Sequence, residues 1–194
     1  CGAKVAMTET DFTSGALATT GRAQDYAIVG EGFFGLYDPA SGEVSYTRCG
    51  AFSLSEFQRQ KTADDGQAEL DENEQPVMET VFMLPDGQGR FVLNDRGAVI
   101  EVTDPKAEQS VGVFDFVNTD GIRRLSENRY QPAAKNGQVR FGTGTVQRGV
   151  LEMSNTDLAE EITKVIEAQR SFSYNLRMVT TSDEIENTVN NLRS

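Results

Sequence analysis

Glycine and proline stop abruptly along this chain, and this boundary limits the possible folds more than any other feature. All 18 glycines lie between Gly2 and Gly149, and the last of the 5 prolines is Pro132. These two residues punctuate secondary structure more strongly than any others, so an even spread followed by complete absence marks a change of structural regime. We therefore predict two parts, a β-rich domain over residues 1–149 and a helical segment over residues 150–194.

The first part has the sequence pattern of short strands separated by turns. β-prone runs occur at residues 26–29, 33–37, 44–47, 51–54, 90–93, 98–102 and 111–117. Turn signals lie between or after them, at residues 38–42, 85–87, 94–97, 119–121 and 136–137. This pattern predicts an antiparallel sheet built from hairpins, not alternating strands and helices. Residues 55–74 are polar and charged, so we expect a mobile loop there, within a divergent loop or insertion over residues 55–78.

The second part has the signals of one long helix. Ser154 and Asn155 are good N-cap candidates, and Asp157, Glu160 and Glu161 place negative charge on the first turns, where the helix dipole favours it. We expect the helix to run from about residue 155 to residue 193, a length on the order of 55–60 Å. That length exceeds what is usual in a globular domain.

Apolar residues recur along this helix at alternating steps of four and three, which is the spacing of a coiled-coil seam. Thr180, Thr181 and Ser182 interrupt the spacing, and Thr181 with Glu184 resembles a new capping box. A helix lying across the β-rich domain is the alternative, but the narrow stripe favours a helical partner that this chain does not contain. The predicted assembly seam, in which Gln169 fills a gap, consists of Leu158, Ile162, Val165, Phe172, Leu176, Val179, Ile185, Val189 and Leu192.

Composition argues against several classes of function. The 30 acidic and 18 basic residues give a formal charge of −12, which repels nucleic acids and anionic lipids. The absence of histidine removes Ser-His and Cys-His hydrolase sites and the usual zinc ligand sets. Carboxylate catalysis and oxygen-ligand metal sites remain open on these grounds. The sequence does not tell whether Cys1 and Cys49 pair, and a start at Cys1 is compatible with a lipid-anchored protein.

Two local patterns resemble ligand sites but have simpler interpretations. Residues 30–35 match G-x-G-x-x-G, yet Pro39 and Gly42 lie where a dinucleotide-binding fold needs a helix. We therefore predict a glycine-rich turn between two strands. The acidic clusters at residues 64–65 and 71–74 lack the alternating ligand spacing of a calcium loop, so we predict a solvated loop there. We expect no catalytic residue, no metal, no cofactor and no small-molecule substrate.

Five segments, in order along the chain, resemble the motifs of bacterial flagellar rod and hook proteins. Residues 12–21 look like the lead-in F-x-x-G-x-L-x-x-T, and residues 25–34 are similar to D-x-A-I-x-G-x-G-F-F. Residues 46–52 resemble Y-T-R-D-G-x-F, residues 151–155 resemble L-E-x-S-N, and residues 160–170 resemble E-(L/M)-x-x-M-I-x-x-Q-R. The residues that carry these motifs are Asp25, Gly30, Gly32, Phe33, Phe34, Tyr46, Thr47, Arg48, Gly50, Phe52, Leu151, Glu152, Ser154, Asn155, Gln169 and Arg170.

The resemblance implies a chain that is mainly β with a long C-terminal α-helix. Residues 1–149 would form the antiparallel β-rich domain of the rod/hook type, and the C-terminal helix would be one half of a helical coiled-coil domain. The other half would be the family's N-terminal helical segment, which the sequence from Cys1 onward does not contain. Two departures stand out, because Cys49 replaces the family's Asp and residues 55–78 do not follow its short hairpin.

For function, the resemblance implies a non-enzymatic structural subunit of the flagellar basal-body rod. Such a subunit would assemble with copies of itself and with other rod and hook proteins into the axial tube that transmits torque. It would pass through the flagellar type III export apparatus without a cleaved signal peptide and reside in the periplasm-spanning rod. A hook-type axial protein of the same family is one alternative, and a secreted or lipid-anchored β-rich surface protein is another.

Overall fold

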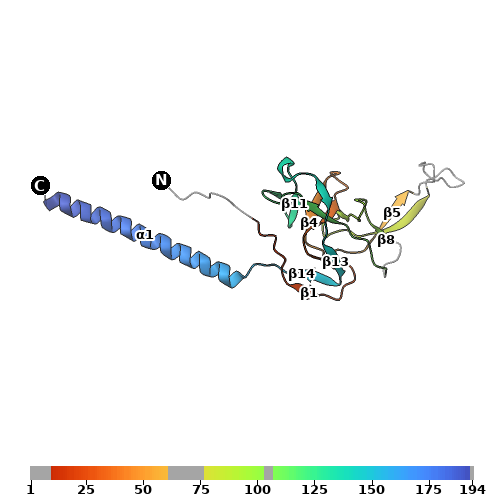
Figure 1. Cartoon of the computed structure of the whole chain (residues 1–194), viewed down its shortest axis with the longest axis horizontal. Helices are drawn as coiled ribbons and strands as arrows, with labels where there is room; N and C mark the ends of the chain where they lie inside the picture. Colours follow the sequence, from red (N-terminus) through yellow and green to blue (C-terminus); the bar gives the residue numbers. More distant parts are fainter. Residues whose placement is uncertain (1–9, 61–76, 103–106, 193–194) are drawn as a thin grey trace. The chain divides into compact units, whose positions relative to one another are not determined.

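The computed structural model describes residues 10–60, 77–102 and 107–192, and the chain divides into two compact units at residues 154 and 155. The first unit contains strands β1 to β14 and a short 3₁₀ helix, η1 (Ala134–Asn136). The second contains one long helix, α1 (Leu158–Leu192). Figure 1 traces both units. The predicted fold class, mainly β with a long C-terminal helix, is confirmed. The division lies five residues beyond the predicted boundary at Gly149, because residues 150–152 form a strand.

The main sheet has seven strands, and every described pairing within it is antiparallel. Its order is β10 (Arg123–Arg124), β11 (Arg129–Gln131), β4 (Val44–Thr47), β3 (Phe33–Tyr37), β9 (Val113–Phe116) and β12 (Val139–Phe141), with β7 (Phe91–Val92) also paired to β3. The hairpin of β3 and β4 matches the two predicted runs residue for residue. A strand pair separated by a Gly-containing turn is what the intervening Asp-Pro-Ala-Ser-Gly sequence favours.

Three smaller sheets complete the unit. β1 (Leu17–Thr19) pairs with β14 (Val150–Glu152), β2 (Tyr26–Val29) pairs with β13 (Thr145–Arg148), and β6 (Met78–Met83) lies between β5 (Ser55–Gln60) and β8 (Glu101–Val102). The predicted strand at residues 51–54 is not present; in that run only Ala51 forms an isolated bridge, to Asp25.

The predicted loop over residues 55–78 is wrong at both of its ends. Residues 55–60 form β5, which pairs in register with β6 from Met78 onward. Arg59 explains part of the error, because it forms ion pairs with Glu79 on the neighbouring strand β6 and with Glu101 on β8, the next strand of the same sheet. Such cross-strand charge pairs stabilise a strand whose composition alone suggests a loop. Residues 61–76, including both acidic clusters, lie outside the described residues.

Two apolar clusters form the core, and β3 separates them. Neighbouring residues of a strand point to opposite faces of the sheet, so Phe34 enters one cluster and Phe33 the other. Phe34 packs edge-on against Phe52, with ring centroids 5.4 Å apart. On the other face, Phe33 contacts Phe116 at 5.3 Å. These aromatic contacts fix how the motif-bearing strands lie against one another.

The helix α1 is continuous, which corrects two expectations about its start and its middle. Asp157, not Ser154 or Asn155, provides the N-cap, since its Oδ1 accepts hydrogen bonds from the backbone of Ala159 at 2.9 Å and Glu160 at 3.3 Å. No break occurs at the predicted capping box, and the Thr180 hydroxyl donates instead to the carbonyl of Arg177 at 2.9 Å.

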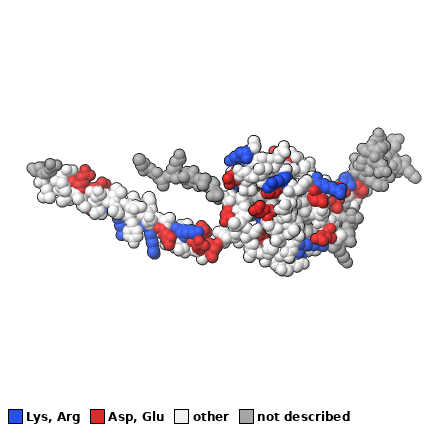
Figure 2. Space-filling model, viewed as in Figure 1, with Lys and Arg blue, Asp and Glu red and all other residues white. Residues whose placement is uncertain are grey.

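The first turns of α1 carry a local network of charges. Lys164 donates hydrogen bonds to Glu160 and Glu161, each at 2.9 Å, and these two interactions raise the pKa of its ammonium group. Further charged residues follow along the helix, and Figure 2 shows them separated by uncharged surface. Charged and apolar residues thus alternate along α1, as in a helix with both polar and apolar faces.

Gly50 provides a test of the core packing. A Cβ atom at this position would lie 1.8 Å from the carbonyl oxygen of Tyr26, so a side chain requires the backbone to move. We predict that Gly50→Ala lowers the free energy of unfolding of the β-rich unit by about 2 kcal/mol or more, measured by urea denaturation. Gly87→Ala is the matched control, because nothing lies within 4 Å of its Cβ position, and it should change stability by less than about 0.5 kcal/mol. Equal effects of the two changes would contradict this packing.

Candidate functional site

Arg48, directly after β4, is the centre of a clamp that joins three segments far apart in the sequence. Its Nε donates to Oε2 of Glu152 at 2.8 Å. Its Nη1 donates to the carbonyls of Gly30 at 3.1 Å and Gly32 at 3.0 Å, and its Nη2 donates to Oγ of Ser14 at 3.1 Å. The fixed fork of a guanidinium group suits this role, because its donors point in several directions within one plane.

Glu152 completes the clamp from the other side. Its Oε1 accepts a hydrogen bond from the backbone of Gly15 at 3.0 Å, while Oε2 accepts from Arg48. The side chains of Arg48 and Glu152 are only 15% and 10% exposed. Removal of either partner therefore leaves a largely buried charge without its counterion, which costs more than the loss of a surface ion pair.

The clamp lies where the chain enters and leaves the β-rich unit. β1 and β14 pair with Leu17 opposite Glu152 and Thr19 opposite Val150. Further backbone hydrogen bonds continue the pairing at both ends, from Met153 to Ala16 at 2.8 Å and from Thr20 to Gly149 at 2.9 Å. The entering and leaving segments of the unit are thus held side by side just before the chain continues toward α1.

The glycine-rich turn between β2 and β3 presents backbone carbonyls to this clamp. Gly30 and Gly32 have φ of +105° and +124°, a region that L side chains rarely adopt. A Cβ at Gly32 would also lie 2.5 Å from Val113. The strand β3 begins at Phe33, where a dinucleotide site would need a helix, so the predicted turn between two strands is confirmed.

The other aromatic and glycine motif residues serve the core. Tyr46 packs against Phe116 with ring centroids 5.0 Å apart, and burial raises the pKa of its phenol. Phe52 and Phe34 belong to the first cluster, and Phe33 and Tyr46 belong to the second. Leu151 lies within β14, opposite Ala18 of β1. These residues hold the strands that position Arg48 and Glu152.

Asp25 is buried, and only its backbone forms a hydrogen bond among the described residues. Its backbone carbonyl accepts from Gly149 at 2.7 Å, but neither carboxylate oxygen has a hydrogen-bond partner among the described residues. The nearest cation is Arg22, with Nη1 3.7 Å from Oδ1. The arrangement ties the start of β2 to the turn before β14.

A strained turn supports the segment that carries Thr47 and Arg48. Glu127 and Asn128, between β10 and β11, have φ of 63° and 55°. The carbonyl of Asn128 accepts a hydrogen bond from the Thr47 hydroxyl at 3.0 Å, and that hydroxyl accepts one from the backbone of Cys49 at 3.0 Å. Residues in this region cost of order 1 kcal/mol unless neighbours hold them, so the turn needs support.

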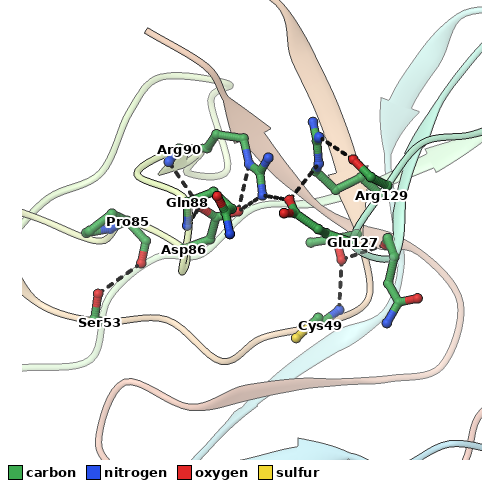
Figure 3. A network of polar contacts seen from close by, with 11 residues as sticks. Cys49, Ser53, Pro85, Asp86, Gln88, Arg90, Glu127 and Arg129 are labelled. Carbon is green, nitrogen blue, oxygen red and sulfur yellow. Dashed lines mark hydrogen bonds and ion pairs between the residues drawn. The ribbon is translucent and has the colours of Figure 1, made fainter. Parts of the chain in front are cut away.

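The polar network in Figure 3 supplies that support. Arg90, largely buried, contacts Asp86 at 2.6 Å and Glu127 at 2.9 Å, and Arg129 lies 3.9 Å from Glu127. Burial of Arg90 works to lower the pKa of its guanidinium, but the hydrogen bonds to Glu127 and Asp86 outweigh burial and raise it. Cys49 itself is exposed and is a free thiol, and Cys1 lies outside the described residues.

A groove of about 990 Å³ lies beside the clamp, between residues 10–14, the glycine turn and residues 115–120. Its two arginines already have carboxylate partners, because Arg48 pairs with Glu152 and Arg140 with Asp115 at 2.7 Å. Within the described residues, no group of three or more Asp, Glu or Cys side chains could hold a metal ion. No helix of the described chain is both long enough and apolar enough to cross a membrane.

The seam residues lie on α1, together with Gln169 and Arg170, and every apolar member is exposed. Because successive residues of a helix are about 100° apart, the continuous helix divides them between two faces. The first stripe lies within about 60° on either side of Leu176. It consists of Leu158, Ile162, Val165, Gln169, Phe172, Leu176 and Val179.

A second stripe lies on the opposite face, between about 160° and 220° from Leu176. Its exposed apolar members are Tyr174, Met178, Ile185, Val189 and Leu192. The predicted seam treated Ile185, Val189 and Leu192 as the continuation of the first stripe. That prediction required an interruption near Thr181, and the helix has none.

Sequence reasoning missed the partners that connect the motifs. It identified Arg48 and Glu152 separately, 104 residues apart, but gave no sign that they contact each other. It also missed β1, although Ser14, Gly15 and Leu17 lie inside the lead-in segment at residues 12–21. Three residues of average β-propensity leave no recognisable pattern, so only the order of the motifs could have suggested this pairing.

Comparison with known proteins gives consistent similarities. Residues 147–192 match the family model described as "Flagellar basal body rod FlgEFG protein C-terminal". The chain is 34% identical to "Flagellar basal-body rod protein FlgG" of Bacillus subtilis (strain 168), over 95% of this chain and 71% of the relative. It is 30% identical to the protein of the same name from Buchnera aphidicola subsp. Baizongia pistaciae, over 95% and 70%. The "Flagellar hook protein FlgE" of Borreliella burgdorferi is 29% identical over 55% of this chain and 27% of the relative.

The clamp gives a direct stability prediction. Arg48→Met should lower the free energy of unfolding of the β-rich unit by about 3 kcal/mol, because Glu152 is left buried without its counterion. Arg140→Met is the control, since Arg140 pairs with Asp115 at 2.7 Å but is 60% exposed, and it should cost less than about 1 kcal/mol. Combining Arg48→Met with Glu152→Gln should cost less than the sum of the two single changes. Additive effects in urea denaturation would show that the two side chains do not act as a pair.

Proposed function

The chain belongs to the family of flagellar basal-body rod proteins and is a structural axial subunit of the rod; from this premise we propose that its copies assemble into the tube that transmits torque. The observation that carries the proposal is the similarity to rod proteins along 95% of the chain at 34% identity. The hook protein similarity covers a smaller part of the chain, which favours the rod over the hook. The subunit assembles into the flagellar axial structure with other rod and hook proteins.

We propose that α1 is the assembly element of this subunit. Every apolar residue of the predicted seam is more than half exposed in the chain by itself. Burial of six such side chains at about 1.5–3 kcal/mol each would supply about 9–18 kcal/mol before the costs of ordering are counted. Helices of other axial subunits, or the N-terminal helical segment that the family resemblance implies, would provide the surface that buries them.

The β-rich unit has a different role in this proposal. The clamp and the paired strands β1 and β14 would hold the entering and leaving segments together, so that the helical part is anchored at one place. The residues Ser154 and Asn155 would form the connection between the clamp and the helix, while Gln169 and Arg170 lie on α1 itself.

We also propose that the chain has no catalytic activity. The rod relatives are named for a structural role, and the sequence has no histidine. We further propose that the protein reaches the periplasm-spanning rod through the flagellar type III export apparatus, without a cleaved signal peptide. The family resemblance supports both parts of this route, and mass determination of the protein from isolated rods would test the second.

A charged residue on the first stripe tests the assembly role of α1. In cells whose own rod protein is replaced by the full-length protein, Leu176→Asp should abolish swimming, because a carboxylate on the stripe opposes burial. Asn175→Asp adds the same charge in the same turn but lies about 100° away from Leu176, between the stripes, and should leave swimming intact. The free energy of unfolding of the β-rich unit should be unchanged in both variants. Full motility with Leu176→Asp would contradict the proposal.

A further inference from the structure

Asn136 and Gly137 are the only Asn-Gly pair in the sequence, and they lie where η1 ends. The side chain of Asn136 is fully buried. Its Oδ1 accepts a hydrogen bond from the backbone of Ala133 at 2.7 Å. Its Nδ2 donates to the carbonyls of Asn118 at 2.9 Å and Asp120 at 3.1 Å. Both hydrogens of the amide thus have acceptors, and an exchange of its oxygen and nitrogen would leave all of these contacts unmatched.

This amide joins η1 to the segment that crosses from β9 to β10. The backbone of Asn118 also donates a hydrogen bond to the carbonyl of Asn136 at 3.3 Å, so the two segments are bonded in both directions. Residues 115–120 form one wall of the groove beside the clamp. A change at Asn136 therefore affects this wall as well as η1.

An Asn-Gly pair can lose its side-chain amide in a reaction that consumes only water. The backbone nitrogen of Gly137 gives its proton to solvent and bonds to Cγ of Asn136, and the bond from Cγ to Nδ2 breaks, which releases ammonia and leaves a succinimide ring. Water then opens the ring. Cleavage between Cγ and the ring nitrogen gives Asp, whereas cleavage between the main-chain carbonyl and that nitrogen gives isoaspartate. Glycine favours ring closure, because it has no Cβ to shield its nitrogen or to restrict its backbone.

The fold opposes this reaction at both stages. Nδ2 can leave only after its two hydrogen bonds break, and the buried side chain is shielded from the solvent that must take the proton and open the ring. We propose that Asn136 is a deamidation site that folding closes, so that only chains that remain unfolded are modified. This inference goes beyond the proposed function, since it concerns the folding of the β-rich unit and does not depend on assembly.

The modified chain would no longer fit the folded unit. A carboxylate only accepts hydrogen bonds, so an Asp at position 136 would face the carbonyl oxygens of Asn118 and Asp120 without a donor. Burial of such a charge is costly. Isoaspartate would in addition lengthen the main chain between η1 and Gly137. Deamidation thus marks a chain that stayed unfolded and opposes its return to the folded state.

Mass spectrometry of the whole chain tests the protection. The chain is kept in buffer and in guanidinium chloride at the same mildly alkaline pH, and the peptide that contains residue 136 is analysed for Asp and isoaspartate. We expect deamidation in guanidinium chloride and a rate at least about a hundredfold lower in buffer, because the reaction must wait for the unit to open. Arg96→Asn is the matched control, since it creates an Asn-Gly pair with Gly97 in an exposed turn, and that pair should react in both solutions. Equal rates at residue 136 in the two solutions would overturn the inference.

A second measurement tests the consequence for folding. Asn136→Asp reproduces one product of the reaction and should lower the guanidinium midpoint of unfolding of the β-rich unit, or prevent its folding. Asn118→Asp adds the same charge to the same network but keeps the hydrogen bond that its Oδ1 accepts from the backbone of Asp120 at 2.8 Å, and should leave the midpoint unchanged. An unchanged midpoint with Asn136→Asp would contradict the inference, because the modified chain would then refold as well as the unmodified one.

Discussion

The ion pair between Arg48 and Glu152 connects the segment that enters the β-rich unit to the strand that leaves it. The same guanidinium group also holds the carbonyls of Gly30 and Gly32, so one side chain fixes three regions of the sequence. Both partners are largely buried. A buried pair of this kind is weak evidence for high stability, but it defines one geometry, since few other arrangements satisfy all of its donors.

The helix α1 differs from the β-rich unit, because its apolar side chains have no core of their own to pack against. An isolated helix is stable only marginally in water, and most helical stability in proteins comes from packing of an apolar face. The described part of α1 buries none of its residues. Exposed apolar surface of this extent marks an interaction surface. A rigid, clamped β-rich unit and a helix that completes its packing only with other chains together suit a subunit that must become rigid on assembly.

The fold class and several strands could be predicted from the sequence, for identifiable reasons. Glycine and proline end at Gly149 and Pro132, so the change from strands to helix was visible, and the runs at residues 26–29, 33–37 and 44–47 matched β2, β3 and β4. Strands of two or three residues, such as β10 and β1, were missed because so short a run has no period to read. β5 was missed because its stability comes from Arg59 and partners on other strands. The predicted single seam was wrong because local capping signals at Thr180 and Thr181 suggested an interruption of the helix. The helix is continuous there, so the seam residues divide between two faces.

Hydrogen exchange of α1 tests most directly whether this helix is built for burial between chains. Amide protection is measured along residues 158–192 in the isolated full-length protein and in assembled rods. The account predicts rapid exchange in the isolated protein and strong protection in the rod, along both the first and the second stripe, because burial there suppresses local opening. Equal exchange in the two states would contradict the account, since the apolar faces of α1 would then gain nothing from assembly.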